Sequence, residues 1–196
     1  MAELLPIEFP QAPSIASASY DFQDIAEGTG VQKFFLAVNE ISGAVSYGLH
    51  TDTVFSTKKE INVGDTNITF SLSAFNLPKA IRGTAYLNCT LKTTAGTGSI
   101  IAELLNDVTG SIVSASSQST VGTGTTNLLI PLVVPETHFR RGEKLQLKIT
   151  DNSAASNEFI GTDPQNRDGT NITPSTDTNG FTNSALYIPF KLEEVS

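Results

Sequence analysis

Four segments of this chain alternate apolar and polar residues with a period of two. They are residues 67–75, 84–92, 144–150 and 185–193. Successive side chains of an extended strand point to opposite faces, so each segment predicts a β-strand with one dry face and one wet face. The side chains predicted to face inward are Ile68, Phe70, Leu72, Ala74, Ala85, Leu87, Cys89, Leu91, Leu145, Leu147, Ile149, Leu186, Ile188, Phe190 and Leu192.

Shorter apolar runs, separated by turn signals, predict further strands. These runs are 33–39, 52–56, 99–105, 111–116 and 127–134. No convincing amphipathic helix is found, so the sequence predicts an all-β fold, an antiparallel two-sheet β-sandwich. Within it the run LLIPLVV, residues 128–134, is apolar on both faces and predicts a strand that is covered on both sides.

Pro189 lies on the predicted wet face of the last strand. Proline has no N–H to donate to a ladder of hydrogen bonds. An edge strand or a β-bulge is therefore expected at this position.

The beginning of the chain has a different character. Residues 1–19 contain three prolines and a run of small residues, and they lack the periodicity of a helix or a central strand. We expect an extended arm here, followed by a sandwich domain over 20–196. Apolar side chains in so short an arm gain burial only against a neighbour, which makes them the predicted partner-binding residues. They are Leu4, Leu5, Ile7 and Phe9.

Charge and cysteine content narrow the function classes. Twelve basic and twenty acidic residues give a formal charge of −8, which disfavours nucleic acids and anionic membranes as partners. The single cysteine, Cys89, is predicted to be a plain buried thiol. The first residues lack the features of a secretory signal, and no window is apolar enough to span a membrane, so synthesis in a host cytoplasm is expected.

Catalytic chemistry is not indicated. The two histidines, His50 and His138, lie in polar or turn-like surroundings, and the G-x-S-x-G elbow of many hydrolases is missing. The glycine pairs at 96–98 and 122–124 lack the Lys-Ser/Thr of a phosphate-binding loop. We therefore predict that the chain is not an enzyme and needs no cofactor.

Two kinds of binding site remain open on the residues alone. Asp163, Asn166 and Asp168 are candidate ligands of a structural Ca²⁺ in the acidic, Asn-rich stretch 151–177, although such a stretch is also ordinary for a polar loop. Tyr86 and Tyr187 both fall on the wet side of their strands and are candidate glycan contacts. Exposed strand tyrosines are equally good β-formers without a ligand.

Residues 83–196 resemble a known type of β-sandwich. The stretch PETHFRRGEKLQLKIT, residues 135–150, resembles the corner Pro-x-x-x-Phe-x-x-Gly-(Asp/Glu)-x-Leu-x-Leu that precedes a late strand in jelly-roll β-sandwiches. Such sandwiches occur in carbohydrate-binding modules and in many virion proteins of tailed phages. The chain as a whole resembles the decoration, or cement, proteins of tailed-phage capsids, which bind the outer capsid surface and are often trimers.

The resemblance implies a virion structural protein that stabilises a phage head. Its expected partners are the major capsid protein or neighbouring virion proteins, together with copies of itself in a homotrimer, and its expected location is the virion. The alternative is a tail, baseplate or fibre module that binds host glycans. An unrelated extracellular binding module is a third reading, which the missing signal disfavours.

Overall fold

The computed structural model describes twelve stretches of the chain. They are residues 18–19, 29–53, 56, 58, 60–63, 67–94, 96–117, 123–152, 158–162, 167–168, 173–174 and 184–191. These residues form strands, turns and loops but no helix, which confirms the predicted all-β class. Consistently, the described residues contain no helix that is long and apolar enough to cross a membrane.

The described residues form fourteen strands. The first seven are β1 (Ala18–Ser19), β2 (Thr29–Ile41), β3 (Ala44–His50), β4 (Glu60–Asn62), β5 (Ile68–Ser71), β6 (Lys79–Thr93) and β7 (Ile100–Asn106). The others are β8 (Gly110–Ser116), β9 (Gly124–Phe139), β10 (Leu145–Asp151), β11 (Glu158–Gly161), β12 (Arg167–Asp168), β13 (Thr173–Pro174) and β14 (Ala185–Lys191). Strand β1 falls within the range predicted as the arm.

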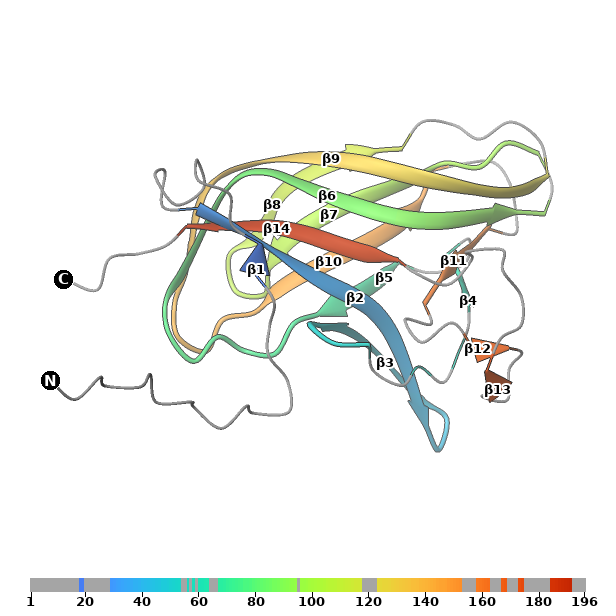
Figure 1. The fold of residues 1–196 in the computed structure, drawn as a ribbon, viewed down its shortest axis with the longest axis horizontal. Helices are drawn as coiled ribbons and strands as arrows, with labels where there is room; N and C mark the ends of the chain where they lie inside the picture. Colours follow the sequence, from blue (N-terminus) through green and yellow to red (C-terminus); the bar gives the residue numbers. More distant parts are fainter. Residues whose placement is uncertain are drawn as a thin grey trace, which may run out of the picture.

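Twelve strands form one hydrogen-bonded sheet. Its order is β4-β11-β6-β14-β2-β3-β5-β10-β7-β8, with β9 beside β6 and β1 beside β2, while β12 and β13 pair separately. The sheet is mixed because β3 and β5 are parallel, although they pair only at Gly48 and Ser71. Figure 1 shows β9, β6, β14 and β2 side by side, with β5, β10, β7 and β8 behind them. The strands predicted as two antiparallel sheets are thus linked along a single path.

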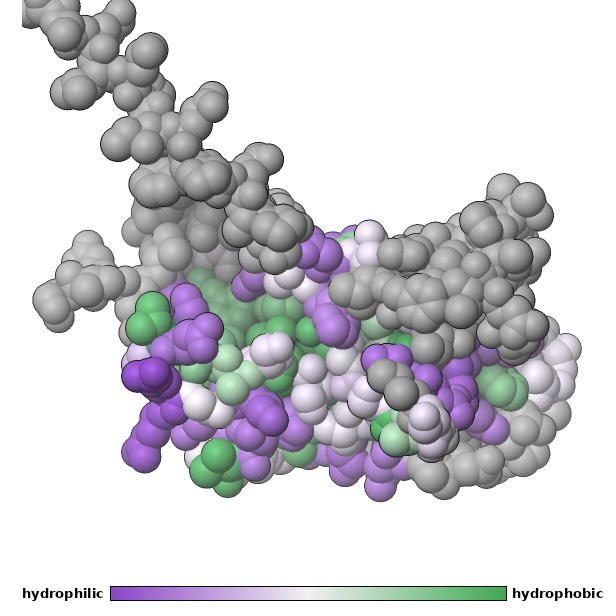
Figure 2. Space-filling view, turned by 90° about the horizontal axis from the view of Figure 1, so that it is seen from below, coloured by the Kyte–Doolittle hydropathy of each residue, from purple (hydrophilic) through white to green (hydrophobic). Residues whose placement is uncertain are grey.

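One apolar core joins the two parts of this sheet. Leu87, Cys89 and Leu91 of β6 share it with side chains of β10 and β14, and each of these three is at most 1% exposed. The predicted core members Leu145, Leu147, Ile149, Leu186 and Ile188 are likewise fully buried. Phe190 is only partly buried, because it lies at one end of the core in a chain of edge-to-face rings with Phe34 and Phe75. From below, other apolar side chains lie in a hollow among polar ones (Figure 2).

Three predicted strands need correction. The segment 52–56 is not a strand at its described positions; instead the Ser56 hydroxyl accepts a hydrogen bond from the Val38 N–H. The run 67–75 stops at Ser71, and Ala74 beyond it is exposed. Strand β14 is central, between β6 and β2, so the edge alternative for Pro189 was wrong.

The bulge alternative for Pro189 is confirmed. The pairing of β14 with β6 shifts register between Tyr187 and Phe190, and the β6–β9 pairing shifts between Ile81 and Gly83. Gly83 has φ = +115°, a conformation that favours glycine, and a Cβ there would lie 3.5 Å from Cγ of Pro189. The irregularity therefore accommodates the proline inside the sheet.

The corner at 135–150 forms as its sequence suggests. Phe139 is buried, Gly142 has φ = +92°, and Leu145 begins β10. One carboxylate oxygen of Glu143 accepts hydrogen bonds from the Arg140 N–H (2.9 Å) and the Asn106 side-chain amide (2.8 Å). These bonds lower the pKa of Glu143, the Arg140 bond contributing most. The acid of the motif thus closes the turn between β9 and β10.

We predict that Leu147→Ala lowers the free energy of unfolding by about 2–5 kcal/mol, because it leaves a cavity in the core. Leu77→Ala is the matched control: Leu77 is 67% exposed, whereas Leu147 is 0% exposed. The control should change stability by no more than about 0.5 kcal/mol. Chemical denaturation measures both values, and a loss below about 0.5 kcal/mol for Leu147→Ala would show that this face is not the core.

A second prediction concerns pH. Because the pKa of Glu143 is lowered in the folded state, its ionised form stabilises the fold above the ordinary pKa of 4.5, and this contribution is lost as the pH falls through the folded-state value. Glu143→Gln cannot titrate, so its free energy of unfolding should fall less than that of the wild type between neutral and acidic pH. Parallel pH profiles for the two proteins would contradict the assignment.

Candidate functional site

The face of β14, β6 and β9 that points away from the core brings together residues far apart in sequence. Tyr187 of β14 pairs with Tyr86 of β6, and Tyr86 pairs in turn with Pro131 of β9. Tyr86 is 40% exposed, while its neighbour Leu87 points into the core. The structure therefore places the two predicted glycan contacts, Tyr86 and Tyr187, next to each other. The alternation within each strand had predicted only that both side chains lie on the wet side.

Strand β9 carries apolar side chains on this outward face as well. Leu129 is 65% exposed and Val133 is 72% exposed, and Pro131 between them is exposed too. We call Tyr86, Leu129, Pro131 and Val133 the outer strip. The sequence had predicted that residues 128–134 are covered on both sides, and this was wrong. Only the inward side of β9 packs on the core of this chain.

Lys33 of β2 lies two strands from Tyr86 on the same face, with Tyr187 between them. It pairs with Tyr187 across the sheet, and its ammonium lies 5.8 Å from the Tyr187 ring centroid and 4.2 Å from that of Phe35. A cation above aromatic rings is held by their negative faces. The row of side chains across the sheet thus begins with a positive charge and continues through two tyrosines to β9.

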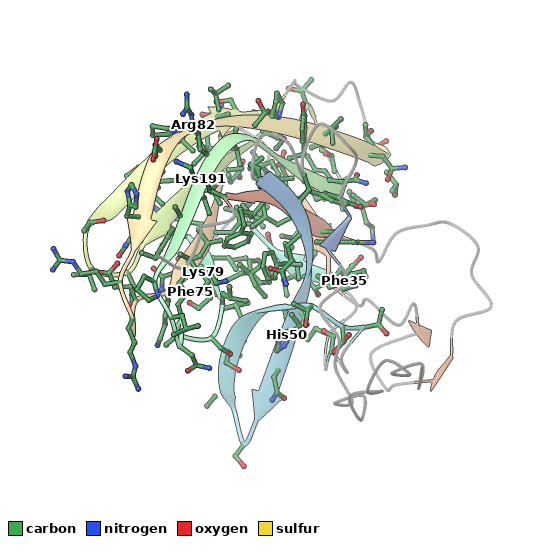
Figure 3. The ribbon with its side chains drawn as sticks, turned by 60° about the vertical axis from the view of Figure 1, so that its left-hand side comes forward. Phe35, His50, Phe75, Lys79, Arg82 and Lys191 are labelled. Carbon is green, nitrogen blue, oxygen red and sulfur yellow. The ribbon has the colours of Figure 1, made fainter. Side chains whose placement is uncertain are left out.

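A charged group lies at one end of the same face. Glu136 is 3.3 Å from the Lys191 ammonium, 3.6 Å from the Arg82 guanidinium and 3.8 Å from Nε2 of His138. Lys191, and after it Arg82 and His138, lower the pKa of Glu136. One carboxylate faces two permanent cations, so the group carries excess positive charge. Figure 3 shows Arg82 and Lys191 on their neighbouring strands.

The other histidine lines a separate cavity of about 450 Å³ on the β2–β3 hairpin. Figure 3 shows His50 well apart from Arg82 and Lys191. Its imidazole lies over Gly48, where a Cβ would collide with Nε2, and burial lowers the pKa of His50, which favours the neutral ring. The described lining offers Ser46, Asn39 and Tyr47 but no carboxylate. His50 therefore has no acidic partner in this lining for acid–base chemistry.

Several predicted site residues fall outside the described part of the chain. These are the arm residues Leu4, Leu5, Ile7 and Phe9, and the candidate calcium ligands Asp163 and Asn166. The third candidate ligand, Asp168, pairs through its backbone with Thr173. Glu158, in the same acidic stretch, is fully buried on β11. The described residues contain no group of three or more His, Cys, Asp or Glu placed to hold a metal ion.

One other sequence assignment, Cys89, has a clear outcome. Cys89 is a buried free thiol, as predicted, and burial raises its pKa to about 12. Tyr47 packs edge-to-face on Phe70 at 5.5 Å and belongs to the margin of the core.

Comparisons with known proteins show likeness in fold only. No family model matches the chain, and no curated protein matches its sequence. Two structures of a CocE/NonD family hydrolase from Staphylococcus aureus align with a TM-score of 0.51, at 11% and 9% identity over 81% and 80% of this chain. This chain spans 36% and 41% of the length of those two chains. Infectious bursal disease virus aligns at 10% identity over 84% of this chain and 44% of that chain, with a TM-score of 0.22, which carries no argument.

Proposed function

We propose that this chain is a structural protein of a tailed-phage virion, a decoration (cement) protein that stabilises the head by binding the outer capsid surface. The observation that carries the proposal is the outer strip. Its side chains Leu129 and Val133 are largely exposed, although the sequence makes β9 apolar on both faces. Contiguous exposed apolar surface is typical of a site that another protein covers.

The proposal includes a finer description of the fold. We infer a jelly-roll-like sandwich with β9, β6, β14 and β2 in one layer and β8, β7, β10 and β5 in the other. The shared core and the pairing of β3 with β5 at a single residue pair support this division. A sandwich with an apolar arm suits a protein that takes its place in a larger assembly.

The proposed partners are the major capsid protein or neighbouring virion proteins, and copies of this chain in a homotrimer. The arm before β1, residues 1–17, would lie on the partner and the sandwich would face outward, in a particle assembled in the host cytoplasm. The role is binding rather than catalysis. His50, whose described cavity lining has no carboxylate, and the exposed His138, which shares Glu136 with two cations, fit this role.

A second candidate is a tail, baseplate or fibre module that binds host glycans. The pairing of Tyr86 with Tyr187, bordered by Lys33, favours it, because adjacent aromatic rings on a flat sheet can stack on sugar rings. Copy number separates the two candidates: a cement protein is present in hundreds of copies per particle, a tail module in a few to some tens. Quantitative mass spectrometry of purified particles supplies that number.

We predict that deletion of residues 1–13 weakens attachment by orders of magnitude, because burial of each of the four apolar arm side chains contributes roughly 1.5–3 kcal/mol before ordering costs. Attachment is measured by co-sedimentation with particles stripped of this chain. The thermal unfolding of the monomeric protein should not change, since the deletion removes no described strand.

A full-length control keeps the length and the prolines of the arm but replaces Leu5, Ile7 and Phe9 by Ser. It should lose attachment like the deletion if the apolar side chains are the anchor. Attachment of both variants at the wild-type level would refute the anchoring role. If the deletion unfolds the free domain, the arm is part of the sandwich instead.

A further inference from the structure

Half of the exposed large hydrophobic side chains in the described part of the chain lie together. Among the described residues, six large hydrophobic side chains are exposed: Val45, Leu77, Tyr86, Val108, Leu129 and Val133. Three of these belong to the outer strip, on paired strands β6 and β9. Single exposed apolar residues are normal, whereas a contiguous group marks a surface that a partner covers. The outer strip is therefore the surface for which an occupant should be sought.

Pro131 indicates how an occupant binds. Strand β9 pairs with β6, and an edge strand can add a further strand through its free backbone groups. Pro131 lies in the middle of β9 and has no N–H, so a continuous new ladder along this edge would be interrupted there. Leu129, Pro131 and Val133 instead offer their side chains on the outward face. An occupant would contact this face rather than extend the sheet.

The chain contains a segment with matching spacing. Leu5, Ile7 and Phe9 recur at every second residue, as do Leu129, Pro131 and Val133. In extended backbone both sets repeat at about 6.6 Å, and the prolines at positions 6 and 10 favour extended backbone. Residues 4–9 can therefore present three apolar side chains in register with the three of β9.

Charge supports the same occupant. The first 32 residues contain five acidic side chains and no lysine or arginine, and two of the acids, Glu3 and Glu8, flank or interrupt the apolar segment. On the same face Lys33 lies two strands from Tyr86, and Arg82 and Lys191 lie at the end of the outer strip, where Glu136 is the acidic partner among the described residues. An acidic apolar segment thus complements a surface that is apolar in its centre and positive at its borders.

We propose that the outer strip binds residues 4–9 of a second copy of this chain. The inference rests on the proposed anchoring role of the arm and names a further partner for it. Each contact joins two different surfaces, the arm of one copy and the strip of the next. Contacts of this kind close into rings when the rotation between copies allows it, which accommodates a trimer.

The point where the arm joins the sheet favours a second copy over the same copy. At Val31 and Gln32, β2 pairs with β14 on one edge and with β1 on the other, so β1 is four strand positions from β9. That distance is roughly 19 Å at about 4.8 Å per position. Residues 10–17 span at most about 26 Å. To reach β9 of the same copy they would have to cross β2, β14 and β6. Residues 4–9 would then lie across β9 rather than along it.

Disulfide trapping tests the proposal directly. One preparation carries Ile7→Cys and a second, differently tagged, carries Val133→Cys; the native Cys89 is buried and unreactive. Mixing under mild oxidation should give a disulfide that joins the two differently tagged chains. The matched control replaces Val133→Cys by Val108→Cys, which is 70% exposed on the β7–β8 turn and should not be trapped. A chain with both cysteines that closes only within itself would overturn the choice of a second copy.

Sedimentation equilibrium of the full chain without any particle provides the second measurement. Val133→Lys, and the closer mimic Val133→Thr should Val133→Lys fail to fold, should raise the dissociation constant for self-association by about ten-fold or more, whereas Val108→Lys should not. Wild-type protein that stays monomeric, or association unchanged by both Val133 variants, would overturn the inference. Copies that associate through Val133 but do not attach to particles would sustain it and refute the capsid role.

Discussion

The hydrogen bonding of β6 on both of its edges is the constraint on which the rest of the structure depends. Its residues 79–93 pair with β9 along one edge, while β14 and β11 divide the other. Side chains such as Leu87 and Leu91 project from it into the core, and Tyr86 projects to the outer face. The register of this strand therefore fixes which residues of β9 and β14 are buried and which form the outer strip.

Sequence periodicity predicted the strands whose two faces meet different surroundings. β6, β10 and most of β14 show clear alternation, because one face of each is dry and the other is wet or half-covered. β3 was not predicted, since most of its side chains are exposed and carry no alternating signal. The sequence also did not predict the extra length of β9 or the central position of β14. Both depend on pairing with β6, which no local pattern encodes.

The sequence likewise predicted only those features of the site that depend on local alternation. The sequence indicated that Tyr86 and Tyr187 point outward, but their contact depends on the register between two strands far apart in the chain. The Lys33–Tyr187 contact and the sharing of Glu136 by Lys191 and Arg82 have the same origin. Because β9 is apolar on both faces, the sequence predicted a strand that is covered on both sides. The described residues cover only one side, so we assign the cover of the other side to a partner.

The central claim is that the outer strip is covered when the protein is assembled. Hydroxyl-radical footprinting with mass spectrometry compares side-chain oxidation in the isolated chain, at a dilution at which it is monomeric, and in purified particles. We expect oxidation of Tyr86 and Leu129 to fall strongly on assembly, with Val108 and Leu77, which are 70% and 67% exposed, as apolar references elsewhere on the surface. Equal oxidation of Tyr86 and Leu129 in both states would contradict the account.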